Sequence, residues 1–134
     1  MSYDCYCDYD SPEWTSHRNV KKSRKQHKCE ECRAIIPAGS TYEYVCGMWD
    51  GSINYFYTCN LCVELREWAT ISVPCFCWAH GNLLADVKDM VDNVRHEVPG
   101  LYFEYGRRMV KIRRVKMERR AGIEPACRAL QAPV

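Results

Sequence analysis

Two Cys-x-x-Cys pairs constrain the fold of this chain more than any other feature. They are Cys29-Glu-Glu-Cys32 and Cys59-Asn-Leu-Cys62, and four thiolates in such pairs suit the tetrahedral coordination of structural zinc. The alternative, a thioredoxin-like redox site, is disfavoured because there are two pairs and no preceding βαβ unit. The sequence therefore predicts one zinc ion held by these four cysteines.

The segment between the pairs predicts a β-hairpin that brings them together. Residues 41–48 and 52–58 are rich in β-forming residues, and Asp50-Gly51 between them is a strong signal for a tight turn. Side-chain alternation groups residues on one face of each strand, namely Tyr42, Tyr44 and Cys46 on the first and Ile53, Tyr55 and Tyr57 on the second. A helix over 63–69 follows, and its N-terminal dipole stabilises thiolate charge.

The rest of the chain predicts further helices. Apolar residues recur at three- and four-residue spacing from Leu83 to Val94, with Asn82 as the candidate N-cap. Leu101, Tyr105, Met109 and Ile112 fit a third helical stripe through about residue 118, although Gly106 weakens it. We therefore expect a small α+β zinc-binding domain with a treble-clef-like or zinc-ribbon-like β-hairpin and two or three helices. Its expected parts are an acidic-then-basic arm (1–28), the zinc module (29–70), a helical part with a basic C-terminal segment (71–120) and a disordered tail (121–134).

Cysteine usage predicts the compartment and a second metal. The chain has ten cysteines in 134 residues, and its N-terminus lacks the charged and then apolar stretches of a secretory signal. We therefore expect a cytoplasmic protein with reduced thiols and no membrane partner. Two matched doublets and a nearby histidine are candidate ligands for a second zinc, namely Cys5, Cys7, Cys75, Cys77 and His80. The alternative is that these thiols are small buried hydrophobes.

Charge is unevenly distributed, although the net charge is only +2. Residues 1–13 are acidic, whereas residues 18–28 and 107–120 are strongly basic. Such patches steer anionic partners, although solvated faces are the alternative. The candidate partner-binding residues are Lys21, Lys22, Arg24, Lys25, Arg107, Arg108, Lys111, Arg113, Arg114 and Lys116. The aromatic residues of the hairpin can stack bases or build a protein-binding face.

Catalysis is not indicated. His80-Gly-Asn82 near a zinc module resembles the His-metal nucleases with a ββα core. Those enzymes need a general-base histidine at the end of a core strand and metal ligands on the helix. The corresponding segments here, Thr58-Cys59 and 63–69, contain no histidine. No triad, paired carboxylates or phosphate loop is visible, and no small-molecule substrate is evident.

The ordered set of motifs resembles small uncharacterised zinc-ribbon proteins of phages and prophages. The resemblance covers roughly residues 3–115 and includes Cys5-Tyr-Cys7, Cys29-Glu-Glu-Cys32, Cys59-Asn-Leu-Cys62 and Cys75-Phe-Cys77-Trp-Ala-His80. It implies an accessory protein of a mobile element and brings no known activity with it.

Three hypotheses about function follow. The first is a non-enzymatic phage or prophage protein that binds a host protein or nucleoprotein complex, for example a CRISPR effector that it inhibits. The second is a DNA- or RNA-binding regulator that uses the same basic patches. The third is a metal-dependent nuclease. Salt dependence separates the first two, because binding dominated by phosphate contacts weakens steeply as ionic strength rises.

Overall fold

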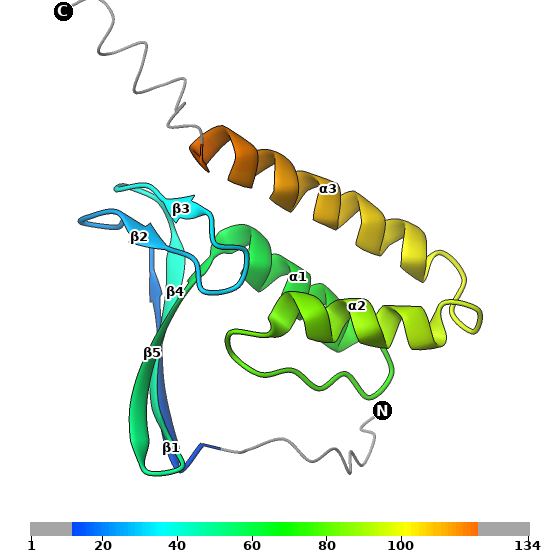
Figure 1. The fold of residues 1–134 in the computed structure, drawn as a ribbon, viewed down its shortest axis with the longest axis horizontal. Coiled ribbons are helices and arrows are strands. Elements are labelled where there is room, and N and C mark those ends of the chain that lie inside the picture. Colours follow the sequence, from blue (N-terminus) through cyan, green and yellow to red (C-terminus); the bar gives the residue numbers. More distant parts are fainter. Residues whose placement is uncertain (1–11, 121–134) are drawn as a thin grey trace, which may run out of the picture.

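The computed structural model describes residues 12–120, in which a β-rich first part is followed by a helical second part. The predicted α+β class is confirmed. Figure 1 shows the three helices together on one side of the long sheet. The elements are β1 (Trp14–Val20), β2 (His27–Lys28), β3 (Ile35–Ile36), β4 (Tyr42–Trp49), β5 (Ser52–Cys59), α1 (Asn60–Ser72), α2 (Leu83–Val94) and α3 (Leu101–Arg120).

The β4–β5 hairpin forms where the sequence predicts it. Asp50 and Gly51 have positive φ angles of 50° and 76°, as both central residues of a tight two-residue hairpin turn require. The antiparallel register places Tyr44 opposite Tyr57. Because cross-strand partners lie on the same face of a sheet, the tyrosines predicted to share a face on each strand form one common face, called here the tyrosine face.

Part of the predicted N-terminal arm of residues 1–28 forms a strand, β1, that the sequence does not indicate. Residues 1–11 lie outside the described residues, but β1 pairs antiparallel with β4 and places Arg18 opposite Tyr44. It is an edge strand in the order β1-β4-β5, while β2 pairs with β3 in a separate two-stranded sheet. The β1 sequence gives little sign of a strand because almost all of its side chains are exposed and polar. Backbone hydrogen bonds to β4 hold it instead.

The opposite face of the long sheet packs against the helical layer. Val45 is fully buried there, and the Arg66 Nη1 of α1 donates a hydrogen bond of 2.8 Å to Glu43 Oε1 of β4. Burial alone raises the pKa of Glu43, but the hydrogen bonds and charge of Arg66 outweigh burial and leave that pKa below its usual value. This nearly buried ion pair therefore fixes how α1 lies on the sheet.

The helical layer is built from the predicted apolar stripes. The predicted stripe of α3, which comprises Leu101, Tyr105, Met109 and Ile112, is buried and faces α1 and α2. The α2 stripe contributes Leu83, Val87 and Val91 to the same core, each fully buried. Within residues 12–120, no helix combines the length and the apolar composition that a bilayer span requires.

The start of α2 differs in detail from the prediction. The helix begins after Asn82 as expected, but the Asn82 side chain makes no capping hydrogen bond to the helix backbone and donates to Asp86 Oδ1 instead. The cap comes from Glu31, which lies between the first two cysteines. Its carboxylate accepts the N–H groups of Gly81 at 2.9 Å and Leu83 at 3.0 Å. The first cysteine pair is thereby tied to a helix that starts about 50 residues later.

Candidate metal centre and basic cleft

Four cysteine thiols meet at the junction between the sheet and α1. The Sγ–Sγ distances are 3.8 Å for Cys29 and Cys62 and 3.7 Å for Cys32 and Cys59. All four sulfurs lie within 4.8 Å of one another, and all four residues are buried. None of the four forms a disulfide. The two pairs can therefore hold a metal ion, as their spacing predicts.

The local backbone aims these sulfurs at one point. In the turn after β2, the Arg33 N–H donates to the Cys29 carbonyl at 3.0 Å, and Arg33 has a positive φ of 65°. The Cys59 N–H points at Cys29 Sγ, with a nitrogen–sulfur distance of 3.4 Å. Cys59 is also the N-cap residue of α1, so the partial positive charge of the helix N-terminus lies beside the thiols. Both features favour thiolate charge.

Ionisation within the cluster is unequal. Hydrogen bonds from Cys32, Cys59 and Cys62 lower the pKa of the Cys29 thiol. The hydrogen bond to Cys29 is the main reason why the pKa values of Cys59 and Cys62 are raised. The hydrogen bond with Cys29 raises the pKa of Cys32, but those with Cys59 and Cys62 outweigh it and leave that pKa lowered. Thiolates at Cys29 and Cys32 are thus favoured, and their negative charge opposes ionisation of Cys59 and Cys62. A cation at the centre of the cluster would allow all four thiols to ionise.

The predicted second metal site is only partly within the described residues. Cys5 and Cys7 lie outside them, so the four-cysteine arrangement stays a prediction. Cys75, Cys77 and His80 lie in the connection between α1 and α2. Among residues 12–120, only the first cluster brings three or more metal-ligating groups together. His80 therefore does not form a ligand group with Cys75 and Cys77.

The structure places His80 among aromatic rings instead. Its ring stacks on Phe56, with 4.7 Å between the centroids, and Trp78 meets it edge-on at 4.6 Å. Burial, followed by the charge of Arg66, lowers the pKa of His80 to about 4. Its Nδ1 is buried and has no hydrogen-bond partner within the described part of the chain. The neutral His80 ring thus packs between the sheet and the α1–α2 connection, and its role as a ligand together with Cys5 and Cys7 stays a prediction.

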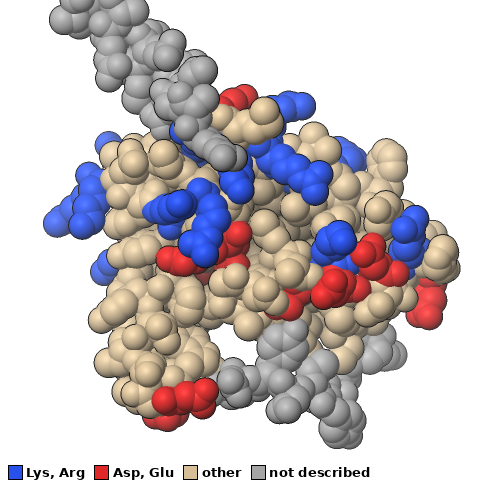
Figure 2. Space-filling model, in the orientation of Figure 1, with Lys and Arg blue, Asp and Glu red and all other residues tan. Residues whose placement is uncertain are grey.

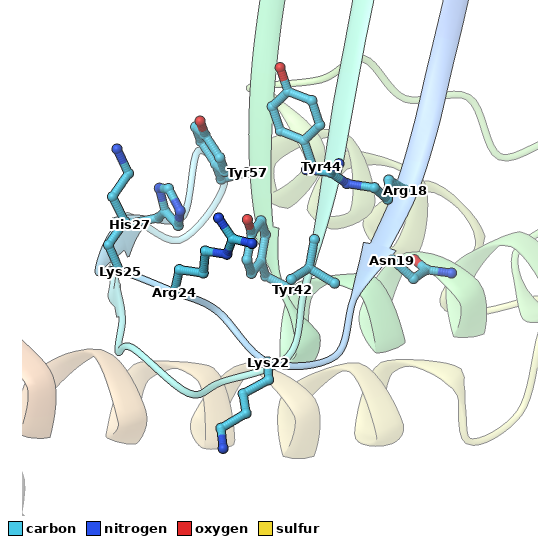
Figure 3. A pocket seen from close by; sticks show the side chains of 10 residues that line it. Arg18, Asn19, Lys22, Arg24, Lys25, His27, Tyr42, Tyr44 and Tyr57 are labelled. Atoms are coloured by element: carbon cyan, nitrogen blue, oxygen red, sulfur yellow. The ribbon is translucent and has the colours of Figure 1, made fainter.

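A second candidate site is a basic cleft beside the tyrosine face. The cleft has a volume of about 1010 Å³ and is lined by residues of β1, the β1–β2 loop, β2 and the tyrosine face. Its cations are Arg18, Lys22, Arg24 and Lys25, and no carboxylate is among its lining residues. In Figure 3 the Arg24 side chain extends toward the tyrosines, whereas Lys22 points away from them. Positively charged side chains and aromatic rings therefore line the same open cleft.

The rings in the cleft form a continuous series. His27 stacks on Tyr57 with 4.2 Å between centroids and an angle of 13° between planes. The ring centroids of Tyr57 and Tyr44 are 5.3 Å apart, and the Arg18 guanidinium lies 5.6 Å from the centre of the Tyr44 ring. Burial, followed by the charge of Lys25, lowers the pKa of His27, so His27 is mostly neutral near pH 7. The cleft combines planar stacking surfaces with fixed cations.

The predicted bases do not gather on a single surface. Lys22, Arg24 and Lys25 line the cleft, but Lys21 does not, and its carbonyl accepts the Thr41 hydroxyl at 3.0 Å. None of the predicted α3 bases lines the cleft. Figure 2 shows blue side chains over α3 as a second basic area of the visible face.

The α3 bases fall into two groups. Arg107 and Arg108 both contact Glu104, at 3.4 Å and 3.1 Å, while Lys116 is half-buried. The three remaining candidates are exposed and, among the described side chains, have no carboxylate within ion-pair distance; they are Lys111, Arg113 and Arg114. Intramolecular neutralisation by Glu104 is therefore limited to Arg107 and Arg108.

No protein-family model matches this chain, and no curated protein or solved structure matches it. The resemblance to phage zinc-ribbon proteins accordingly stays a prediction. Sequence reasoning did not single out Arg18 or His27 as site residues. Arg18 would follow from predicting β1, since pairing with β4 places it opposite Tyr44, whereas His27 lies in β2 and is paired with Ile36 of β3. Nothing in the sequence indicates the capping role of Glu31, because its partners are 50 and 52 residues away.

Proposed function

We propose that this protein binds single-stranded nucleic acid in the basic cleft. The observation that carries the proposal is the cleft lining, which combines four cations with a series of aromatic rings and contains no carboxylate. Proteins that bind single strands combine a positively charged groove for the phosphates with aromatic rings on which bases stack. Stacking tolerates every base, so the expected binding has little sequence preference. The proposed activity is binding alone, and no residue is assigned to catalysis.

The metal proposed for the cysteine cluster is zinc. A tetrahedron with Zn–S bonds of about 2.3 Å has sulfur–sulfur edges of about 3.8 Å, and the distances of 3.8 Å and 3.7 Å agree with this value. The order of cysteine turn, hairpin and cysteine pair at a helix start supports a treble-clef assignment of this module. Elemental analysis of the purified protein should give one zinc per chain from this cluster. A folded preparation that contains no zinc would contradict the metal assignment.

Zinc would act on the cleft indirectly. Its ligand Cys59 is the last residue of β5, two positions after Tyr57. Its ligand Cys29 follows His27 by two residues, and the Glu30 N–H donates to the Tyr57 carbonyl at 2.8 Å. The metal would thus hold the stacked pair of His27 and Tyr57 in place without contacting the nucleic acid. A metal in this role is structural.

The hypotheses of phage origin and of docking to a host defence complex stay predictions. Sequence reasoning ranks a host macromolecule first and a nucleic acid second. The cleft favours the second, because stacked rings beside cations suit bases and phosphates together. A host nucleoprotein complex, the target in the first hypothesis, would also offer single-stranded nucleic acid. Binding to such a complex would therefore use the same stacking and phosphate contacts.

The test is fluorescence anisotropy with a labelled oligothymidine and a labelled duplex of equal length. Lys25→Ala, in the cleft, is compared with Lys88→Ala, an exposed lysine on α2. Lys25→Ala should weaken oligothymidine binding and lower the slope of log K against log salt by about 0.7, the value for one lost single-strand phosphate contact. Lys88→Ala should leave both quantities unchanged.

A second variant separates stacking from charge. Tyr44→Leu retains bulk in the tyrosine face but removes the ring, and it should cost about 1–3 kcal/mol of binding with an unchanged salt slope. Equal effects of Lys25→Ala and Lys88→Ala would refute the cleft as the binding site. Tighter binding of the duplex than of the single strand would refute the proposed ligand.

A further inference from the structure

The outward face of α3 carries large apolar side chains in water. Phe103 is 74 % exposed, Val110 is 53 % exposed and Met117 is 72 % exposed. These residues do not belong to the buried stripe of α3, which faces α1 and α2. The helix is therefore apolar on two sides, and the core explains only one of them. An exposed apolar stripe on a folded protein commonly marks an interaction surface.

The spacing of this stripe fits a partner helix. Phe103, Val110 and Met117 are separated by seven residues each, the repeat with which one helix packs along another. Gly106 lies between the first two, and a Cβ added there would meet nothing within 4 Å. A groove of about 750 Å³ runs here, lined in part by Phe103, Gly106 and Val110. A side chain from a facing helix can enter the space that Gly106 leaves.

Charge selects among the candidate occupants. Arg107, Lys111 and Arg114 flank the apolar stripe along one edge, and Lys111 and Arg114 have no carboxylate within ion-pair distance among the described side chains. Glu118 is the one acid in the same row, at its C-terminal end. A second copy of α3 would place cations against cations, which opposes self-association. Phosphates would satisfy the cations but would leave the apolar centre exposed. An acidic helix satisfies both.

We propose that α3 docks an amphipathic helix of a partner protein through this face. The partner helix would insert apolar side chains beside Phe103, Gly106 and Val110, and its flanking Glu or Asp side chains would pair with Arg107, Lys111 and Arg114. This site is separate from the basic cleft, with which it shares no lining residue. The protein would then bind a nucleic acid and a partner protein at the same time. Binding of the nucleic acid rests on the proposed function, whereas docking of the partner helix does not.

The test uses two designed helical peptides of about three heptads with leucine at the a and d positions. One peptide carries glutamate at e and g, and the other carries lysine. The full-length zinc-loaded protein should bind the glutamate peptide and not the lysine peptide. Val110→Asp should weaken this binding at least about tenfold. Ile71→Asp is the matched control, because Ile71 is 86 % exposed on α1, and it should change binding less than about twofold.

A charge exchange supplies the decisive comparison. The triple variant Arg107→Glu, Lys111→Glu and Arg114→Glu should exchange the preference, binding the lysine peptide in place of the glutamate peptide. Its oligothymidine binding should match that of the unmodified protein, so failure of the α3 proposal and failure of the cleft proposal are told apart.

Three outcomes would overturn the inference. The first is that the glutamate peptide does not bind, or that both peptides bind equally. The second is sedimentation that shows a dimer which Val110→Asp dissociates, because the stripe would then be covered by a second copy. The third is oligothymidine binding that the triple variant abolishes, because α3 would then contact nucleic acid.

Discussion

Replacing Glu31 by alanine should weaken the attachment of α2 without removing a metal ligand. The Glu31 carboxylate accepts two backbone N–H groups at the start of α2. Loss of a helix N-cap costs about 1 kcal/mol, and loss of a negative charge at a helix N-terminus costs about 0.3–1 kcal/mol more. Burial, the largest influence on the pKa of Glu31, raises that pKa, which indicates that the carboxylate is partly desolvated. We expect a loss of about 2 kcal/mol of unfolding free energy.

Glu30→Ala is the matched control, because Glu30 occupies the same turn between the cysteines. Its carboxylate contacts only the exposed Arg33, at 3.8 Å, within the described residues, and an exposed pair contributes about 0–1 kcal/mol. Urea denaturation in the presence of zinc compares the two variants. With an m-value of about 2 kcal/mol/M, Glu31→Ala should lower the midpoint by about 1 M. Glu30→Ala should lower it by less than half of that.

Hydrogen exchange adds a local measurement. The amides of Gly81 and Leu83 should exchange faster in Glu31→Ala and at an unchanged rate in Glu30→Ala. Zinc content measured on both variants shows whether the metal site is intact. Equal midpoints for the two variants, or unchanged exchange at Leu83 with zinc bound, would refute the capping role.

Three further predictions concern metal, pH and the ion pair. Strong chelation, or Cys62→Ser, should unfold the protein as seen by circular dichroism, because structural zinc contributes on the order of 10–16 kcal/mol to small zinc modules; a chelated protein with native helicity would contradict this. The pKa of His80 in the folded protein is about 4, below the ordinary histidine value of 6.5. The unfolded chain therefore binds the proton more tightly, and stability present above pH 6.5 falls as the pH drops toward 4. His80→Phe should show a shallower fall over this window in urea denaturation, and parallel curves would argue against burial of the imidazole. Arg66→Ala should cost about 3–5 kcal/mol because it leaves Glu43 buried without its partner, and a loss below 1 kcal/mol, measured by thermal unfolding, would show that the pair is hydrated.

Local patterns predict most of the central module. The Asp50-Gly51 turn, the tyrosine face and the four-cysteine cluster depend on spacing and turn chemistry, both of which are visible in the sequence. The buried stripe of α3 is likewise visible, from Leu101 to Ile112. Each of these features is set by residues within a few positions of one another, or by one hairpin that brings its two ends together.

The features that sequence reasoning misses depend on long-range packing. β1 is stabilised by pairing with β4, and its exposed side chains carry little apolar alternation. The same pairing sets Arg18 of the basic cleft beside Tyr44. The stacking of the His80 ring on Phe56 of β5 likewise joins residues far apart in the sequence. In each case the partner is distant along the chain, and no local pattern names it.

The position of Cys59 sets where this chain can change length. Cys59 ends β5, is the N-cap residue of α1 and belongs to the four-cysteine cluster, so no connecting residue separates strand from helix. One residue inserted between Cys59 and Cys62 would turn the rest of α1 by about 100°, rotating Leu65 out of the core. The connection between α2 and α3, residues 95–100, contains no residue of the four-cysteine cluster. Related chains should therefore vary in the length of the α2–α3 connection. They should keep the same number of residues between Cys59 and Leu65.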